Sequence, residues 1–494
     1  MTTTDRLPAG TGTASSRRKQ LSLLVLCGAV FLDALDISLL GVSLPSIKTG
    51  LHLSDGSLQW LVSGYTVGYG GFLLLGGRVA DVWGRRRTFV CATILFIVAS
   101  LLGGALTDGS LLVATRVLKG VAAGFTAPAA MSIITTTFRE GPERNRALGV
   151  FAMTGASGYS FGLVLSGVLT EINWHLVFFV PGILATVVLI ASPLIAADVR
   201  KAAGRARQRF DTGGALAVTA GVMLLVYGLV QAPSWGWGSP TTLLTLAGAV
   251  LLLVVFVAIE RRHSAPLVPL SIFRSRPLST ANLVSVVWAG STIGWQFVAT
   301  LYLQETLHYS ALRTAFAFLP LGIVIVAVAK YASGPLVDRW GVRTVTTLGM
   351  ALQGLGVLLF LQVGLHTGYA AVMFPAIVLH GVGNGLVYPT VNIAGVGGVA
   401  DERQGVAAGL ITASYQIGAG IGVAVLAAVL TGTAAGAGST ANYRWAFLVA
   451  GLFSAAGLLA GFLGLRSTAR LSAASGPAVQ QPQPQQPQQA VAGQ

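Results

Sequence analysis

Charged residues make up only 10% of this 494-residue chain, whereas a soluble globular protein carries about 25%. So little charge cannot cover a surface that faces water, which excludes an ordinary soluble domain. Hydrophobic residues account for 54% of the chain, and apolar stretches of about 20 residues, the length that crosses a bilayer, recur throughout. The composition therefore predicts an all-α integral membrane protein with many spans.

The residue patterns of metal sites, ATP sites and covalent catalysis are also missing. Cys27 and Cys91 are the only cysteines, and both fall in apolar segments, so no disulfide framework is expected. The sequence has no Gly-Lys-Ser/Thr phosphate loop, no Cys/His spacing typical of a metal site and no Ser/His/Asp arrangement. We therefore expect neither an enzyme nor an ATP-driven pump, and no bound cofactor.

The apolar segments predict fourteen membrane spans. Because the number of spans is even, both termini are expected on the same side of the membrane. The spans are roughly 20–45, 57–77, 88–107, 110–135, 147–170, 176–197, 212–232, 240–259, 278–304, 312–336, 343–364, 368–392, 404–431 and 443–465. Twenty-five of the 31 Lys and Arg residues fall on the side of the termini, and only Lys48, Arg313 and Arg444 fall on the other. Because cytoplasmic loops carry an excess of Lys and Arg, we expect a bacterial cytoplasmic membrane protein with both termini in the cytoplasm. The net charge of +15 is then a signal of topology and of contact with lipid, and no nucleic-acid partner is expected.

Two loops repeat one pattern. "GGRVADVWGRRR" (76–87) follows the second span and "SGPLVDRWGVR" (333–343) follows the tenth, and both combine Gly, Asp, Gly and a basic residue at the same spacing. Glycines suit a tight turn because they allow backbone conformations that other residues avoid. The repeated gate residues are Gly77, Asp81, Gly84, Arg85 and Arg86 in the first loop and Gly334, Asp338 and Gly341 in the second. We expect Asp81 to cap a helix of the other half and close the cytoplasmic side.

The loop repeat divides the chain into two similar halves. We expect a six-helix bundle at 20–197, a second at 278–466, and a linker at 198–277 that contains two extra spans. Residues 1–19 and the Pro/Gln-rich residues 467–494 are expected to be disordered cytoplasmic tails, because neither can bury apolar area. Two repeat-related bundles with a site between them are an arrangement found in secondary transporters.

The sequence resembles the major facilitator superfamily, and within it the fourteen-helix drug:proton antiporter family. The loop pattern is similar to the superfamily's loop signature, "LDISLLGVSLPSI" (35–47) to the family's first-helix signature, and "RVLKGVAAG" (116–124) to its fourth-helix motif. "LYLQETLHYSALRTAFAFLP" (301–320) and residues 402–422 also fit. The resemblance implies a monomeric exporter of hydrophobic, cationic drugs or antibiotics. It would exchange them for protons, with the proton gradient as its energy source and membrane lipid around it.

Four ionisable residues lie deep inside two predicted spans: Asp33 and Asp36 in the first, Arg116 and Lys119 in the fourth. Lys330, another base within a predicted span, lies near its cytoplasmic end. A charge at the bilayer centre costs at least about 2.5–3.5 kcal/mol, and such residues are usually functional. At a rise of 1.5 Å per residue in a core of about 30 Å, the depth of Asp36 matches that of Arg116, and the depth of Asp33 matches that of Lys119. We therefore expect two ion pairs, Asp36–Arg116 and Asp33–Lys119.

The two pairs have different interpretations. Asp36 matches the first-helix aspartate of the family, and a carboxylate that loses and regains a cationic partner changes its proton affinity, which is what coupling of protons to a substrate requires. Lys119 replaces the family's glutamine, and Asp33 stands where a neutral residue is usual. A static electrostatic lock between the helices is the alternative for all four residues; we favour function for Asp36–Arg116.

The fifth span also departs from the family. In "GYSFGLVLSG" (158–167), Gly158, Gly162 and Gly167 fit the family's antiporter motif, whereas Leu163 replaces its proline and Ser166 one of its glycines. Small residues still allow close packing of helices, but the proline kink is lost. Either the antiport mechanism is altered, or the substrate geometry differs, or the change is neutral.

Residues of the second half are weaker candidates. His380, Asn384 and Tyr388 recur at i, i+4 and i+8 on one face of the twelfth span, and Gln304 of the ninth fits the family pattern. All four are expected to line the cavity. A histidine there could titrate near neutral pH, but a buried, packed histidine is an equal alternative.

Two other functions stay open. The altered fifth span favours a dedicated exporter of one metabolite or lipid without strict proton antiport. From a different class, the chain could be a membrane sensor that retains the fold without transport, although a sensor needs neither paired gate loops nor buried charges.

Overall fold

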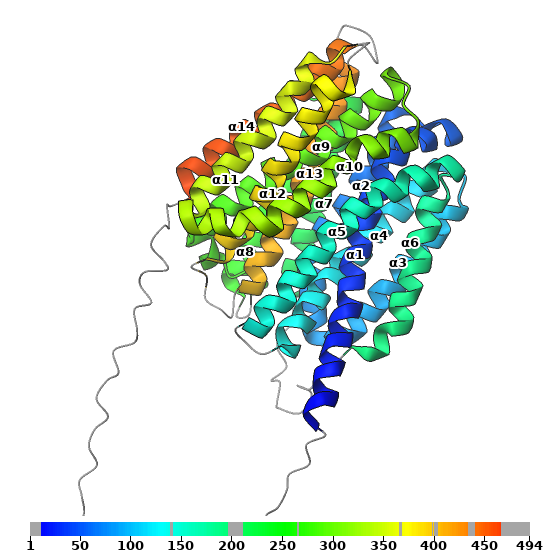
Figure 1. Cartoon of the computed structure of the whole chain (residues 1–494). Coiled ribbons are helices and arrows are strands. Elements are labelled where there is room, and N and C mark those ends of the chain that lie inside the picture. The colour runs from blue at the N-terminus through cyan, green and yellow to red at the C-terminus, as the bar shows by residue number, and fades with distance from the viewer. Residues whose placement is uncertain are drawn as a thin grey trace, which may run out of the picture.

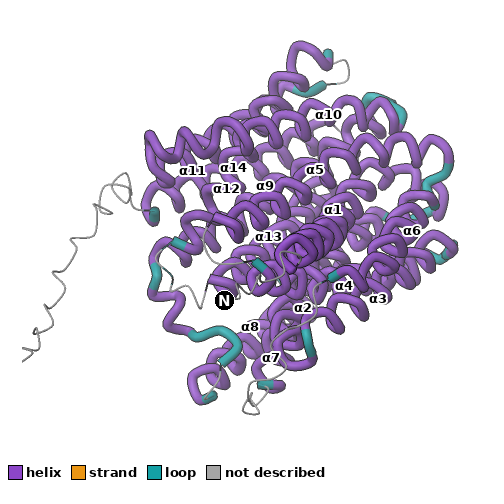
Figure 2. Tube along the Cα trace, turned by 60° about the horizontal axis from the view of Figure 1, so that its bottom comes forward, coloured by secondary structure: helices purple, strands orange, loops and turns teal. Residues whose placement is uncertain are grey.

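The computed structural model describes residues 11–138, 142–195, 211–263, 266–364, 368–397, 399, 404–432 and 440–465. In these ranges the chain is helical and contains no strand (Figure 2). The principal helices are α1 (Thr11–Leu51), α2 (Asp55–Trp83), α3 (Arg85–Ala105), α4 (Gly109–Thr137), α5 (Pro142–Ile172), α6 (Leu176–Ala191), α7 (Thr212–Trp235), α8 (Pro240–Arg262), α9 (Arg276–Leu301), α10 (Ala311–Ala327), α11 (Ser333–Leu359), α12 (Phe374–Val396), α13 (Gln404–Gly432) and α14 (Thr440–Gly464). Short 3₁₀ or π turns adjoin several of them, among them η4 (Tyr302–Thr306) and η5 (Val328–Ala332).

The helices form two bundles that lie side by side (Figure 1). In the first, α1 packs on α5 and α6, α2 on α4, and α3 on α4 and α6; in the second, α9 packs on α13 and α14, and α11 on α12 and α14. The most extensive contacts between the bundles join α5 with α10 and α2 with α13, and α1 also contacts α9 and α10. Because α1 and α4 belong to the first bundle, its interior holds all four ionisable residues named above.

The helices α7 and α8 form a separate pair beside the two bundles. They pack on each other, and α7 also packs on α2 and α13, one helix from each bundle. The hydroxyl of Thr219 on α7 donates a hydrogen bond of 2.8 Å to the carbonyl of Gly71, and the Trp60 indole N–H donates one of 3.2 Å to Gln231. The pair is therefore attached along the seam between the bundles.

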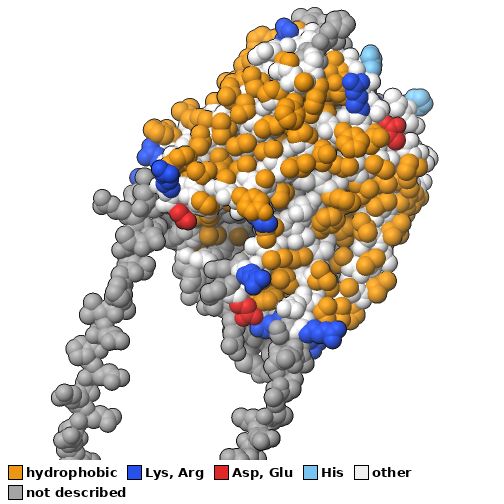
Figure 3. Space-filling view, viewed as in Figure 1, with side chains coloured by type: hydrophobic (Ala, Val, Ile, Leu, Met, Phe, Trp, Pro, Cys, Tyr) orange, Lys and Arg blue, Asp and Glu red, His pale blue; other side chains and the backbone are white. Residues whose placement is uncertain are grey.

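The outer surface suits a lipid environment. Hydrophobic side chains cover most of the face in Figure 3, and its charged side chains gather toward two opposite ends. Ile190, Leu244 and Leu463 are among the large apolar side chains left exposed. Twelve helical segments of the described residues are long and apolar enough to cross a membrane. The helix α2 is not among them, and the segment 311–362 joins α10 and α11, so the count of fourteen spans stays a prediction.

The loop repeat forms turns that are shorter than predicted. The helix α2 runs on to Trp83, and only Gly84, with φ at 111°, separates it from α3. Gly341, at the equivalent position, has φ at 77° and breaks α11. The prediction that Gly77 lies in the turn is wrong, because it lies inside α2. Hydropathy marks where a span leaves the apolar layer, whereas the helix itself continues beyond that point.

The start of the chain also differs from its prediction. Residues 11–19, expected in the disordered tail, form the first turns of α1. The Lys19 ammonium lies 2.9 Å from the Glu143 carboxylate on α5, which holds this extension to the first bundle. Residues 1–10 and the predicted Pro/Gln tail lie outside the described residues, as do 198–210 of the predicted linker.

Candidate functional site

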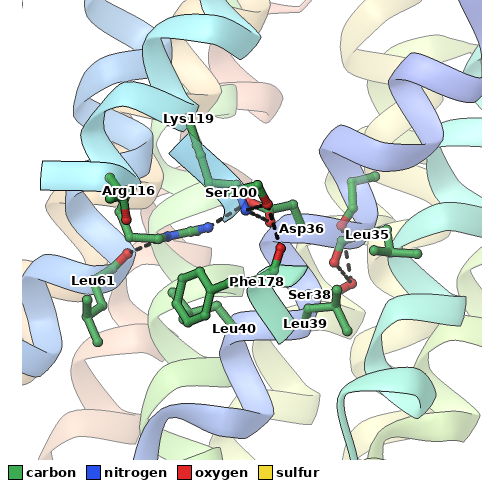
Figure 4. Close-up of polar contacts among 12 residues, drawn as sticks. Leu35, Asp36, Ser38, Leu39, Leu40, Leu61, Ser100, Arg116, Lys119 and Phe178 are labelled. Carbon is green, nitrogen blue, oxygen red and sulfur yellow. Dashed lines mark hydrogen bonds and ion pairs between the residues drawn. The ribbon is translucent and has the colours of Figure 1, made fainter. Parts of the chain in front are cut away.

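A buried cluster of charges joins α1 to α4. The Asp36 carboxylate accepts hydrogen bonds on both oxygens: from Arg116 Nη1 at 2.6 Å on Oδ2, and from Lys119 Nζ on Oδ1 (Figure 4). Asp36, Arg116 and Lys119 are at most 2% exposed. Charges so thoroughly removed from water are tolerated only when they are paired and hydrogen-bonded, which makes this cluster a strong constraint on the position of both helices.

Neighbouring helices supply the remaining partners of the two bases. Arg116 Nε donates to the carbonyl of Leu61 on α2 at 3.1 Å. Lys119 Nζ donates to Ser100 Oγ on α3 at 3.0 Å, and Ser100 in turn donates to the carbonyl of Phe178 on α6 at 2.6 Å. The cluster therefore connects α1, α2, α3, α4 and α6 through hydrogen bonds.

Close packing and aromatic rings hold the two bases in place. A methyl group at Gly120, next to Lys119, would overlap the carbonyl of Tyr65, so only glycine allows α4 to approach α2 this closely. The Arg116 guanidinium carbon lies 4.9 Å from the centre of the Tyr65 ring, and Lys119 Nζ lies 4.8 Å from that of Phe96. Such contacts stabilise cations more strongly when water is excluded.

The structure confirms the predicted Asp36–Arg116 pair and contradicts the predicted Asp33–Lys119 pair. Lys119 binds Asp36 and not Asp33, so both bases converge on a single acid. Asp33 has no hydrogen bond or ion pair within the described residues, and it is 8% exposed. Matching depths along the helix axis misled the prediction, because one turn advances a helix by only 5.4 Å and the flexible four-carbon stem of lysine easily spans that step.

The glycines of α5 lie at two different helix contacts. Methyl groups at Gly158 and Gly162 would overlap the backbone of α1 at Phe31 and Leu35. A methyl at Gly167 would instead meet α10 of the second bundle, 2.5 Å from Ala315 Cβ. Ser166, which departs from the family motif, donates a hydrogen bond to the carbonyl of Leu39 on α1. The substituted residue therefore has a structural role that sequence reasoning missed.

The two bundles are tied together at one end, which we call the distal end: the end where α1 and α5 finish and α10 begins. Lys48 Nζ lies 2.9 Å from Glu305 Oε1, and Glu171 accepts a hydrogen bond of 3.2 Å from the backbone N–H of Leu312. Gln304 donates one of 2.7 Å to the carbonyl of Val42. Gln304 was expected to line the cavity, but it is one of these ties because η4 carries it to the end of its helix.

The second-half candidates divide between packing and exposure. His380 is fully buried, and its ring stacks on that of Trp295 with centroids 4.1 Å apart, so the packing alternative describes it and the cavity-lining one is wrong. Asn384 is also buried and accepts a hydrogen bond of 2.8 Å from Trp288 Nε1. Tyr388 is 43% exposed. Of the three, only Tyr388 is available to a ligand in this conformation.

The gate residues lie at the end opposite the distal ties. Asp81 pairs with Arg85 across the Gly84 turn, with 3.7 Å between Arg85 Nη2 and Asp81 Oδ1. Arg86 is partly exposed, and Gly334 and Asp338 are exposed near the start of α11. The capping of a second-half helix by Asp81 stays a prediction.

The site consists of charged side chains that can form ion pairs and exchange protons. Within the described ranges, no three His, Cys, Asp or Glu side chains are grouped so that they could hold a metal ion. Sequence reasoning found all three members of the cluster but missed Ser100 and the carbonyls of Leu61 and Phe178. A single serine in an apolar helix and two backbone oxygens leave no periodic signal in the sequence.

Comparison with known proteins gives one family. The family model of the Major Facilitator Superfamily matches residues 26–423 and 326–492. The puromycin resistance protein pur8 of Streptomyces alboniger is 37% identical over 422 residues, which cover 85% of this chain and 83% of that protein. The cephamycin export protein CmcT of Amycolatopsis lactamdurans is 34% identical, with 85% and 87% covered. The tetracenomycin C resistance and export protein of Streptomyces glaucescens is 32% identical, with 83% and 75% covered.

Solved structures share the architecture at much lower identity. The POT family transporter PepTSo superposes with a TM-score of 0.65 at 17% identity, covering 90% of this chain and 96% of that one. The human organic anion transporter MFSD10 gives a TM-score of 0.63 at 14% identity, with 90% and 99% covered. At these identities the likeness concerns the fold alone.

Proposed function

This chain belongs to the major facilitator superfamily, a family of transporters and not of enzymes, and from that premise we propose that it exports hydrophobic, drug-like molecules from the cell in exchange for protons. Its relatives are named for resistance to, or export of, puromycin, cephamycin, lincomycin and tetracenomycin C. We place it in the bacterial cytoplasmic membrane as a monomer with both termini in the cytoplasm. The proton gradient is its energy source, without a cofactor.

The observation that carries the proton part of the proposal is the buried cluster of Asp36, Arg116 and Lys119. Breaking a buried ion pair is costly, yet replacing a whole pair by apolar residues is often neutral, so stability alone does not require such a cluster. Ionisable groups inside membrane proteins are usually functional. We assign proton and substrate coupling to this cluster together with Asp33.

The proposed cycle alternates access to a midplane site between the bundles. The distal ties, which the predicted topology places outside the cell, hold the outer side closed while a substrate enters from the cytoplasm or the inner leaflet. Movement of one bundle against the other breaks these ties, and a proton from outside replaces the substrate. Asp81 and its loop then close the cytoplasmic side.

The expected positive charge of the substrate has less support than its hydrophobicity. Asp36 is already neutralised by two cations, so it offers little attraction to a third. Tyr388 of α12 is 43% exposed, and Tyr159 of α5 and Tyr415 of α13 are partly exposed. Their rings offer apolar faces with polar edges, which suit uncharged aromatic compounds as well as cationic ones.

One observation favours the alternative of export without strict antiport. The helix α5 continues from Pro142 to Ile172 with no proline after its first residue, so it lacks the kink of the family motif. A sensor without transport remains the alternative of another class.

Expression in a drug-sensitive bacterial host tests the proposal. We use puromycin, lincomycin and tetracenomycin C as the export panel, and we expect lower accumulation of at least one of them in cells that express the chain than in cells with an empty vector. Addition of a protonophore is expected to restore accumulation, because the energy comes from the proton gradient. Unchanged accumulation of all three, with the chain present in the membrane, would favour the sensor.

A further inference from the structure

Two carboxyl groups stand one helical turn apart on α1 in different surroundings. Asp36 is 1% exposed and accepts a charge-assisted hydrogen bond on each oxygen. Asp33 is 8% exposed, and within the described residues it has neither a hydrogen bond nor an ion pair. The acid that the family resemblance points to is thus fully occupied, and the additional acid of this chain is free to change its charge.

Protonation would have opposite consequences at the two positions. A proton on Asp36 would remove the acceptor of Arg116 and Lys119 and leave two buried cations close together without an anion, which is strongly unfavourable. A proton on Asp33 would produce a neutral carboxyl in a largely apolar site, which burial favours. Loss of that proton would produce an anion that the ammonium of Lys119 attracts and the carboxylate of Asp36 repels. The two states of Asp33 are therefore both accessible.

We propose that Asp33 is the carboxyl group that takes up and releases the transported proton, while Asp36 stays ionised as the anchor of Arg116 and Lys119. The inference rests on the proton antiport proposed above and names the acid that carries it out. An ammonium group has three N–H donors, and Lys119 uses one on Asp36 and one on Ser100. The third is available to Asp33 when it ionises, so proton release draws Lys119 toward the preceding turn of α1 and moves α4 relative to α1.

Few titratable or charged groups face Asp33. Asp36 on its own helix and Lys119 on α4 act on it electrostatically, and it acts on the hydroxyls of Tyr65 and Tyr69 on α2. Arg116, the other base of the cluster, is held on Asp36 and on the carbonyl of Leu61.

The other helices packed on α1 have their charged residues near their ends, far from Asp33. In α5 these are Glu143, Arg144, Arg146 and Glu171; α6 has none; α9 has Arg276 at its start and α10 has Arg313 near its start. Tyr159 in the middle of α5 donates its hydroxyl to Gln296. The charge state of Asp33 therefore depends on the cluster itself.

Infrared difference spectra of the purified full-length protein between high and low pH test the assignment without any substrate. The wild type is expected to show the C=O band of a buried protonated carboxyl that grows as pH falls. Asp33→Asn is expected to lose this band, and Asp33→Glu to retain it at a shifted position and midpoint. The control is Asp108→Asn, an exposed cap of α4 whose amide still caps the helix. Persistence of the band in Asp33→Asn would overturn the proposal.

Transport in proteoliposomes separates this proposal from the proposed function. In Asp33→Asn we expect exchange of a panel compound across the membrane to continue while its acceleration by a pH gradient is lost, and in Asp33→Glu the acceleration to remain. A gradient that still accelerates transport by Asp33→Asn as much as by the wild type contradicts the role of Asp33 alone. A wild type that ignores the gradient contradicts antiport itself.

Discussion

Replacement of Asp36 by Asn is expected to destabilise the protein and to abolish export. The neutral amide cannot compensate Arg116 and Lys119, which are both fully buried. Removing one partner of a buried ion pair costs about 3–5 kcal/mol, and here one acid serves two bases. Thermal unfolding in detergent, followed by the loss of the monomer peak in size-exclusion chromatography, measures stability, and accumulation of the export panel in cells measures function.

Two further variants identify the cause of that loss. Asp36→Asn combined with Lys119→Gln leaves one buried cation in place of two and is expected to regain part of the thermal stability without regaining export. Asp108→Asn removes an exposed carboxylate that caps α4 and is expected to match the wild type in both assays. A single Asp36→Asn protein with wild-type unfolding temperature and export would show that the buried cluster is dispensable.

Replacement of Gly167 by Leu is expected to hold the distal end open. A Cβ at this position would lie 2.5 Å from Ala315 Cβ and 2.9 Å from Leu312 Cα, so the larger side chain separates α5 from α10. The two bundles keep their own cores, because Gly167 lies where they meet and not within either one. We expect export to fall at least about tenfold, since blocking one conformation by about 1.4 kcal/mol already shifts its population tenfold.

Spin labels on opposite sides of the distal end measure this change directly. Labels at Thr49 of α1 and His308 before α10, in a chain without Cys27 and Cys91, are expected to lie farther apart in Gly167→Leu than in the reference protein. Gly149→Leu is the matched control, because it lies on the same helix with nothing within 4 Å of its added Cβ. An unchanged distance together with lost export would mean that Gly167 acts in another way.

The residue types of the site and the Asp36–Arg116 pair could be predicted from the sequence, but the acid that binds Lys119 could not. An acid or base inside an apolar span is conspicuous, so Asp36, Arg116 and Lys119 could be found from their positions in the predicted spans. Which acid receives Lys119 depends on side-chain reach and on the approach of α4 to α2 at Gly120, and neither is visible in a depth estimate. The Ser100 contact depends on α3 packing against α4 and could not be found from the sequence.

The fold, too, could be predicted from the sequence only in part. The loop repeat indicated two related halves, and Gly84 and Gly341 adopt the positive φ angles that its glycines suggested. Hydropathy could not show that α2 continues to Trp83 or that α1 begins at Thr11, because a helix keeps its hydrogen bonds beyond the apolar layer. His380 was assigned to the cavity by its spacing on a helix face and Gln304 by the family pattern, and tertiary packing turns both away from the expected cavity.

The central claim is that a proton gradient drives export through this chain. Its most direct test reconstitutes the wild type in proteoliposomes, imposes a pH gradient without a membrane potential, and measures accumulation of the panel compound that cells export. One proton exchanged for one uncharged molecule predicts accumulation of up to about tenfold per pH unit, abolished by a protonophore. Equilibration of the compound to equal concentrations on both sides, at a rate that the gradient does not change, would contradict proton antiport and leave facilitated export as the account of this protein.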